Sequence, residues 1–142
     1  MDKYNALKLE NQLCFPLYAA SREIVKKYHP YLDEINLTYT QYIAMMVFWE
    51  KGSLSAKELG EILYLDSGTL TPVLKSLEKK GFITRVRSTN DERVLIVQIT
   101  DEGERLKEKA VDIPSKVATC VKLEGDEALF LHKILYKILG EL

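Results

Sequence analysis

The sequence has few of the residues that mark several common functional classes. Only two of its 142 residues are cysteine and two are histidine, and no two of these four are close neighbours in the chain. That spacing excludes a zinc pattern and a disulfide scaffold. A glycine-rich phosphate loop and a Ser-His-Asp set are also missing. We therefore expect no metal, no cofactor and no enzymatic activity.

Long hydrophobic runs and an excess of one charge are missing too. The longest apolar run, 42–49, is far shorter than the ~20 residues that span a bilayer, so no membrane partner is expected. The polar N-terminus, MDKYNALKLENQ, predicts no secretory signal, and we expect a cytoplasmic protein with reduced cysteines. The 20 Lys and Arg against 21 Asp and Glu argue against indiscriminate coating of nucleic acid. The length allows a single domain with its own core.

Residues 55 to 80 carry the start and stop signals of two short helices. Ser55 to Glu58 is a capping box, and apolar residues follow it at helical spacing. After a three-residue turn, Asp66 can cap a second helix from Ser67 to Lys80. Pro72 predicts either a later start or an irregular first turn for this helix. Two capped helices joined by a sharp turn are the skeleton of a helix-turn-helix.

The outward face of the second helix suits contact with DNA. It carries small hydroxyl residues near its start and a lysine further along, which can reach base edges and phosphates. The alternative is an ordinary solvated surface. The candidate DNA-binding residues on this helix are Ser67, Thr69, Thr71, Pro72 and Lys75.

A basic β-hairpin is predicted next. Two β-branched runs, 83–87 and 94–99, flank the polar tip 88–92. Arg85, Arg87 and Arg93 concentrate positive charge there, and an arginine at such a tip can enter a narrow minor groove. Asp91 is better placed to orient Arg93 than to meet a phosphate. From 67 to 87 there are five basic residues and one acidic residue, so the strip is locally basic. Together these signals predict a winged helix-turn-helix DNA-binding region over 37–100.

The remaining segments are predicted to be helical. Pro30 should end a helix that begins near Leu13, and a break is expected at Pro114. The apolar stripes of 1–36 and 101–142 are larger than the module can cover, so we interpret them as dimerisation helices. The predicted fold is one domain over 1–142, mostly α with a small β-hairpin wing (α+β). A homodimer would place two recognition helices about one DNA turn, ~34 Å, apart on a palindromic site of double-stranded DNA.

Several stretches resemble a known family. LDSGTLTP (65–72), GFITR (81–85) and NDER (90–93) are similar to the signature of MarR-type winged-helix transcription regulators, and the likeness extends from about residue 9 to 114. ENQLCF (10–15), Tyr18, Tyr28, Tyr39 and VDIP (111–114) resemble the OhrR-like branch, which senses organic hydroperoxides. The resemblance implies a repressor that leaves its operator when Cys14 is oxidised. It also implies that Tyr28 and Tyr39 of the partner subunit hold Cys14.

The setting of Cys14 fits that role on physical grounds. Pro16 predicts a helix start nearby, with Asn11 as N-cap, and this would place Cys14 in the first turn. Unpaired amides and the helix dipole favour a thiolate there, which a peroxide oxidises first to sulfenic acid. A buried structural thiol is the alternative. In some OhrR-like regulators a second cysteine, here Cys120, closes an inter-subunit disulfide; otherwise Cys120 is a bystander.

Three functional hypotheses therefore stand. The first is a redox-switched repressor with Cys14 as sensor. The second is a MarR-type regulator switched by a small aromatic or phenolic ligand, in which the cysteines are structural. The third is a thiol peroxidase in which Cys14 and Cys120 cycle, and for which the two cysteines are the whole support. Turnover of peroxide separates the third hypothesis, and a Cys14→Ser variant separates the first two.

Overall fold

The computed structural model describes residues 2–141. It is mostly helical with one small antiparallel sheet, as predicted from the sequence. The elements are η1 (Asn5–Leu7), η2 (Leu9–Asn11), α1 (Cys14–Glu34), α2 (Tyr39–Lys51), β1 (Ser53–Ser55), α3 (Ala56–Leu63), α4 (Ser67–Lys79), β2 (Ile83–Arg87), β3 (Leu95–Ile99), α5 (Asp101–Ala110), α6 (Ile113–Ala118) and α7 (Gly125–Glu141). No helix within residues 2–141 is both long and apolar enough to cross a bilayer.

Helix α1 differs from the prediction at both ends. It begins at Cys14 without a side-chain cap, so the prediction of Asn11 as N-cap is wrong. Asn11 instead belongs to η2, and its Nδ2 donates to the carbonyl of Asn5 at 2.8 Å. The predicted end at Pro30 is also wrong, because α1 continues to Glu34. Proline removes one backbone hydrogen bond, and complete burial of the Leu32 side chain in the following turn offsets that loss.

The helix-turn-helix has the predicted boundaries. Ser55 Oγ accepts from the Glu58 amide at 3.1 Å and starts α3. The Glu58 carboxylate accepts from the Ser55 hydroxyl and not from the Ser55 amide, so the second half of the predicted capping box is not formed. Asp66 Oδ1 accepts from the Thr69 amide at 2.7 Å and starts α4. Pro72 lies inside α4, which is helical from Ser67 onward. The predicted later start and the predicted irregular first turn are therefore both wrong.

The wing is part of a three-stranded sheet with the order β1-β3-β2. The short strand β1, which we did not predict, pairs antiparallel with β3 and places Leu54 opposite Val97. Both side chains are buried. The predicted hairpin partners, β2 and β3, pair with Arg85 opposite Val97. The strand β1 therefore fixes the base of the wing to the start of α3.

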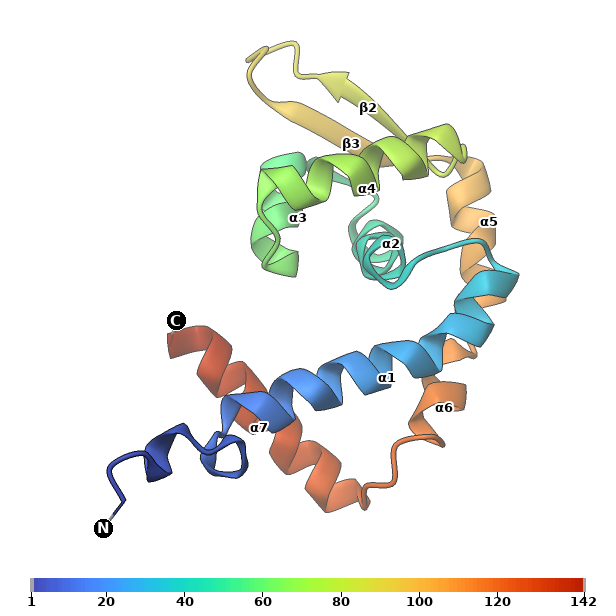
Figure 1. Cartoon of the computed structure of the whole chain (residues 1–142). Coiled ribbons are helices and arrows are strands. Elements are labelled where there is room, and N and C mark those ends of the chain that lie inside the picture. The colour runs from blue at the N-terminus through green and yellow to red at the C-terminus, as the bar shows by residue number, and fades with distance from the viewer. Residues whose placement is uncertain (1, 142) are drawn as a thin grey trace.

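Helix α2 forms the centre of the molecule, between α1 and the helix-turn-helix (Figure 1). It follows a complete capping box at Thr38 and Gln41, and its C-cap is Gly52, whose φ is +77°. Its Phe48 and Met45 side chains are fully buried. The core that surrounds them draws on α3, α4 and the sheet, with Leu59, Leu74, Leu77, Ile83 and Val97.

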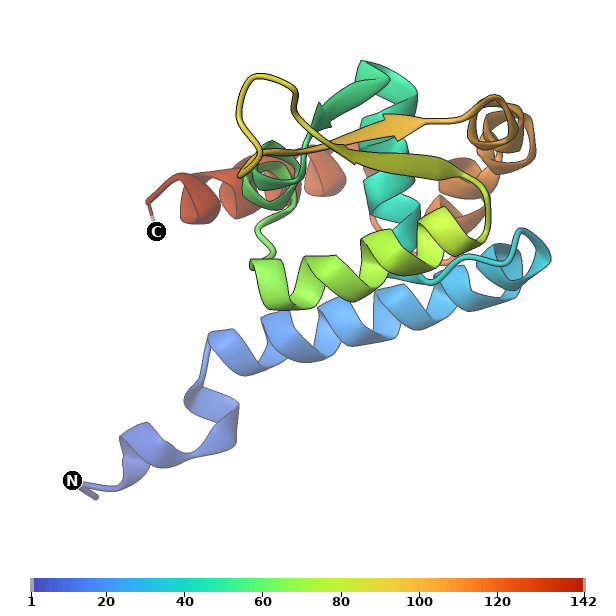
Figure 2. The same ribbon diagram turned by 90° about the horizontal axis from the view of Figure 1, so that it is seen from above.

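The two ends of the chain leave apolar side chains uncovered. In α7, Leu129 and Phe130 are 75% and 64% exposed, and Leu13 beside α1 is 81% exposed. The N-terminal segment projects beyond the rest of the molecule in both ribbon views, and α7 stands apart from α1 in the view from above (Figures 1 and 2). Exposed apolar surface of this extent is typical of an interaction face.

Candidate nucleic-acid interface and redox site

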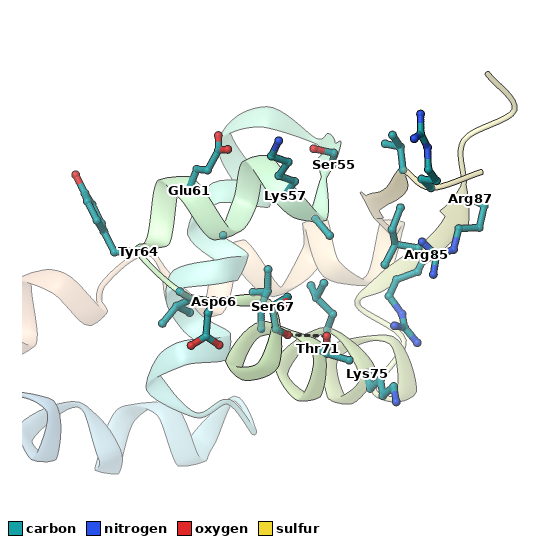
Figure 3. A pocket seen from close by; sticks show the side chains of 18 residues that line it. Ser55, Lys57, Glu61, Tyr64, Asp66, Ser67, Thr71, Lys75, Arg85 and Arg87 are labelled. Carbon is teal, nitrogen blue, oxygen red and sulfur yellow. Dashed lines mark hydrogen bonds between the residues drawn. The ribbon is translucent and has the colours of Figure 1, made fainter. Parts of the chain in front are cut away.

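The outward face of α4 presents the predicted recognition residues to solvent. Ser67, Thr69, Pro72 and Lys75 are exposed. Thr71 is exposed too, and its hydroxyl donates to the Ser67 carbonyl at 2.7 Å (Figure 3). The opposite face, with Leu70, Val73, Leu74 and Leu77, is buried in the core. This division leaves the polar face of α4 free along its N-terminal half.

An open groove of about 1040 Å³ runs between α3, α4 and the wing. Its lining includes five basic side chains, Lys57, Lys75, Arg85, Arg87 and Arg93, and two acidic ones, Glu61 and Asp66. Figure 3 shows Lys75, Arg85 and Arg87 on one side of the groove. A concave surface with an excess of positive charge attracts a polyanion such as a phosphate backbone.

The Arg85 side chain is held in an ion pair that the sequence did not predict. Its Nη2 lies 3.0 Å from Glu78 Oε1, and the Arg85 side chain is only 20% exposed. The guanidinium beside Glu78 lowers the pKa of that carboxyl. This ion pair joins the wing strand β2 to α4 and neutralises part of the predicted basic strip. Glu78 and Arg85 are seven positions apart and lie in different elements, so no local sequence pattern predicted this ion pair.

Arg93 has the environment predicted for it. Its side chain is 91% exposed at the wing tip and is paired with Asp91 at 3.1 Å. The hydrogen bonds to Arg93 lower the pKa of the Asp91 carboxyl. Arg87 is also exposed, at the wing end of β2.

Tyr64 is a surface residue that we did not predict. It caps α3 in the left-handed conformation, with φ of +56°, and its side chain is 62% exposed. Such a backbone costs free energy in any residue other than glycine and is enriched at functional turns. Gly60 permits this tight turn, because a Cβ there would lie 2.9 Å from the Leu65 carbonyl oxygen. Tyr64 lines the groove on the side away from Lys75 (Figure 3).

The two cysteines are both free and exposed. Cys14 is the first residue of α1, where the sequence predicted it, and it lies among the uncovered apolar side chains Leu13, Phe15 and Leu17. Cys120 follows α6, with its Sγ 3.8 Å from the Lys116 carbonyl oxygen. Exposure makes both thiols accessible to an oxidant or to a second copy of the chain.

The predicted tyrosines divide into two groups. Tyr28 and Tyr39 are in edge-to-face contact, with ring centroids 5.0 Å apart, and Tyr42 lies beside both. We call these three residues the tyrosine cluster. Tyr18 is separate and exposed on α1, where the Arg22 guanidinium lies 5.4 Å from its ring centroid. Within residues 2–141 of one chain, no hydrogen bond joins a tyrosine hydroxyl to a cysteine.

Burial controls the protonation of the tyrosine cluster. It raises the pKa of Tyr28 and Tyr39, and it raises the pKa of Tyr42 to about 12. All three hydroxyls therefore keep their protons near neutral pH and can donate hydrogen bonds to an anion.

The described residues contain no group of His, Cys, Asp and Glu side chains that could hold a metal ion.

Comparison with known proteins places the chain in a family. Residues 26–110 match the family model described as transcriptional regulator SarA/Rot. The organic hydroperoxide resistance transcriptional regulator of Bacillus subtilis is 51% identical over 99% of this chain and 96% of its own length.

Solved structures agree with this placement. Reduced AbfR bound to DNA has a TM-score of 0.80 and 34% identity, over 99% of this chain and 98% of the AbfR chain. Disulfide-formed AbfR, at 33% identity over 98% and 94% of the two chains, has a TM-score of 0.64. AbfR is a protein of Staphylococcus epidermidis. The present chain belongs to the MarR-type winged helix-turn-helix transcriptional regulators, in the branch of the organic hydroperoxide resistance regulators.

Proposed function

We propose that this protein is a homodimeric repressor whose affinity for a palindromic operator falls when an organic hydroperoxide oxidises Cys14. One observation carries the proposal. The Cys14 thiol is exposed at the first residue of α1, on an apolar surface that one chain leaves uncovered. The relative that shares 51% of the sequence is named for organic hydroperoxide resistance.

The DNA-binding part of the proposal uses α4 and the wing. Ser67, Thr69 and Thr71 would face base edges in the major groove, where hydroxyl groups on short stems can approach closely. Lys75 would contact phosphates. Arg93 would enter the adjacent minor groove from the wing tip. Reduced AbfR has been solved bound to DNA.

A second copy of the chain would complete the sensor. The exposed apolar side chains of α7 and of the start of α1 need a partner surface, and a two-fold pairing buries the same patch of both copies. In that dimer the cluster hydroxyls of Tyr28 and Tyr39 would donate to the partner's Cys14 thiolate. Tyr18, exposed four residues after Cys14, would line the same site.

The oxidation step balances without a metal or cofactor. The Cys14 thiolate attacks an oxygen of the hydroperoxide, an S–O bond forms as the O–O bond breaks, and the leaving alkoxide takes a proton to become an alcohol. The resulting sulfenic acid can condense with the Cys120 thiol of the second copy, releasing water and forming a disulfide. Disulfide-formed and overoxidised forms of AbfR have been solved.

One experiment tests the proposal and its alternatives. DNA binding, intact mass and a non-reducing gel are compared before and after one equivalent of cumene hydroperoxide. We expect the parent to lose DNA and gain an oxidised Cys14, and Cys14→Ser to bind DNA and ignore the peroxide. If the Cys14→Ser variant still released DNA after the hydroperoxide was added, a small aromatic or phenolic ligand would be favoured as the signal. In a second assay with excess hydroperoxide and a reductant, consumption of many equivalents per chain would favour a peroxidase.

A further inference from the structure

Gln41 is a polar side chain in the core with every polar atom engaged. It is 7% exposed. Its Oε1 accepts from the Thr38 amide at 3.1 Å and from Lys80 Nζ at 2.9 Å. Its Nε2 donates to Ser76 Oγ at 2.9 Å. A buried amide with such partners holds them in one arrangement, because separating any of them would leave a buried polar group unpaired.

These hydrogen bonds connect two distant parts of the chain. Thr38 is the N-cap of α2, whereas Ser76 lies in the last part of α4 and Lys80 is the C-cap of α4. The same Lys80 ammonium also donates to the Asn36 carbonyl at 2.6 Å, in the connection from α1 to α2. The C-terminal end of the recognition helix is therefore fastened to the α1–α2 corner.

The other side of the same helical turn carries the tyrosine cluster. Tyr39 and Tyr42 flank Gln41 in the first turn of α2 and lie 5.0 Å and 5.7 Å from the Tyr28 ring centroid. Because an α-helix turns by about 100° per residue, Gln41 points roughly 200° away from Tyr39. One helical turn thus has the proposed sensor contacts on one side and the link to α4 on the other.

We propose that Gln41 is the positioning residue that couples the tyrosine cluster to α4. The inference rests on the proposed function: when oxidation of Cys14 displaces the Tyr39 ring, the first turn of α2 moves and takes Gln41 with it. Helix α4 has 13 residues and is about 20 Å long. A shift at its C-terminal end therefore tilts its N-terminal end, where Ser67 and Thr69 face the proposed DNA site.

Two substitutions of similar shape separate coupling from packing. Gln41→Met fills the same volume but removes all three hydrogen bonds. Gln41→Glu keeps an acceptor for the Thr38 amide and for Lys80, and the Ser76 hydroxyl can turn to donate to the carboxylate. The double variant Ser76→Ala/Lys80→Met removes the link from the α4 side. Lys79→Met is the control, because Lys79 is an exposed neighbour that makes none of these bonds.

The readout is the ratio of operator Kd after and before cumene hydroperoxide, measured on the full-length dimer with a duplex selected by the reduced protein. The oxidation state of Cys14 is followed by intact mass in the same samples. We expect a ratio of about 10–100 for the parent, Gln41→Glu and Lys79→Met, within the usual range of allosteric coupling. For Gln41→Met and for Ser76→Ala/Lys80→Met the ratio should fall to within about threefold of one while Cys14 is still fully oxidised. Loss of a simple DNA contact shifts both Kd values together and leaves the ratio unchanged.

Failure of this inference and failure of the proposed function look different. A parent ratio near one would overturn both. A large parent ratio that persists in Gln41→Met would overturn the role of Gln41 and leave the redox switch standing. If Gln41→Met does not fold, the Ser76→Ala/Lys80→Met variant decides the question, and a parental ratio in that variant would overturn the coupling.

Discussion

Arg93 and Asp91 form a two-point ion pair at the tip of the wing. Arg93 Nε lies 3.1 Å from Asp91 Oδ1, and Nη2 lies 3.2 Å from Oδ2. The Asp91 carboxylate also accepts from the Arg93 amide at 3.0 Å. The guanidinium is thus exposed and yet fixed in direction, which reduces the side-chain entropy that it would lose on entering a minor groove.

Arg93→Ala should weaken operator binding by about 1–3 kcal/mol and leave the dimer folded. Asp91→Ala should cost less, because the charge remains and only its orientation is lost. Fluorescence anisotropy at fixed salt measures both, with Arg105→Ala, an exposed residue of α5, as the control. An Arg93→Ala protein that binds as tightly as the Arg105→Ala protein would remove the wing from the DNA interface.

Cys120→Ser should separate the two stages of the proposed oxidation. We expect it to bind DNA when reduced and to form sulfenic acid at Cys14, but to give no cross-linked dimer on a non-reducing gel. Intact mass with a sulfenic-acid trap checks the first product. A dimer band that persists in this variant would show that Cys120 is not the cysteine that forms the disulfide with Cys14.

Local signals in the sequence predicted the DNA-reading part of the fold well. The side-chain caps at Ser55 and Asp66 both accept from the amides expected of them, because an N-cap depends on a few adjacent residues. The same locality explains the Asp91–Arg93 pair. Features of this kind need no knowledge of the tertiary structure.

Features that depend on distant partners were missed. The strand β1 has three residues and is stabilised by pairing with β3, about forty positions later. Pro30 and Pro72 remain inside helices because buried neighbours such as Leu32 and Val73 hold the following turns. The Arg85–Glu78 pair and the Gln41 hydrogen bonds likewise join separate elements. No pattern along the chain encodes them.

Tyr28→Phe and Tyr39→Phe should slow oxidation of Cys14 without changing reduced-state DNA binding. Burial raises the pKa of both tyrosines, so both hydroxyls are protonated donors that would stabilise a thiolate. Loss of one such bond corresponds to a rate reduction of roughly tenfold, or about 1.4 kcal/mol. Stopped-flow oxidation measures the rate, and Tyr31→Phe is the control. Equal rates of Cys14 oxidation in all three variants would show that the tyrosine cluster does not stabilise the Cys14 thiolate.

Gly103→Ala should destabilise the fold by at least about 1–3 kcal/mol. A Cβ there would collide with the Phe82 carbonyl oxygen and lie 2.8 Å from Ile99 Cγ1. The Gly103 carbonyl also accepts from Trp49 Nε1 at 2.9 Å, so fluorescence of this single tryptophan reports the damage during urea unfolding. Gly125→Ala is the control, since no atom lies within 4 Å of its added Cβ. Equal midpoints for the two variants would contradict the close contact.

The stability of the fold should decrease in alkali through Tyr42. Its pKa is raised to about 12 by burial, and its side chain is 2% exposed. Below the unfolded pKa of about 10, Tyr42 is neutral in both states, and its contribution to stability is complete. Between pH 10 and 12 only the unfolded chain releases the proton, so the free energy of unfolding falls by up to about 1.4 kcal/mol per pH unit, roughly 2–3 kcal/mol in all.

Urea unfolding of the parent and of Tyr42→Phe at pH 8, 10 and 11 tests this, because phenylalanine has no proton to lose. The pH dependence of Tyr42→Phe should be shallower than that of the parent, whereas parallel curves would mean that Tyr42 titrates alike in the folded and unfolded chains.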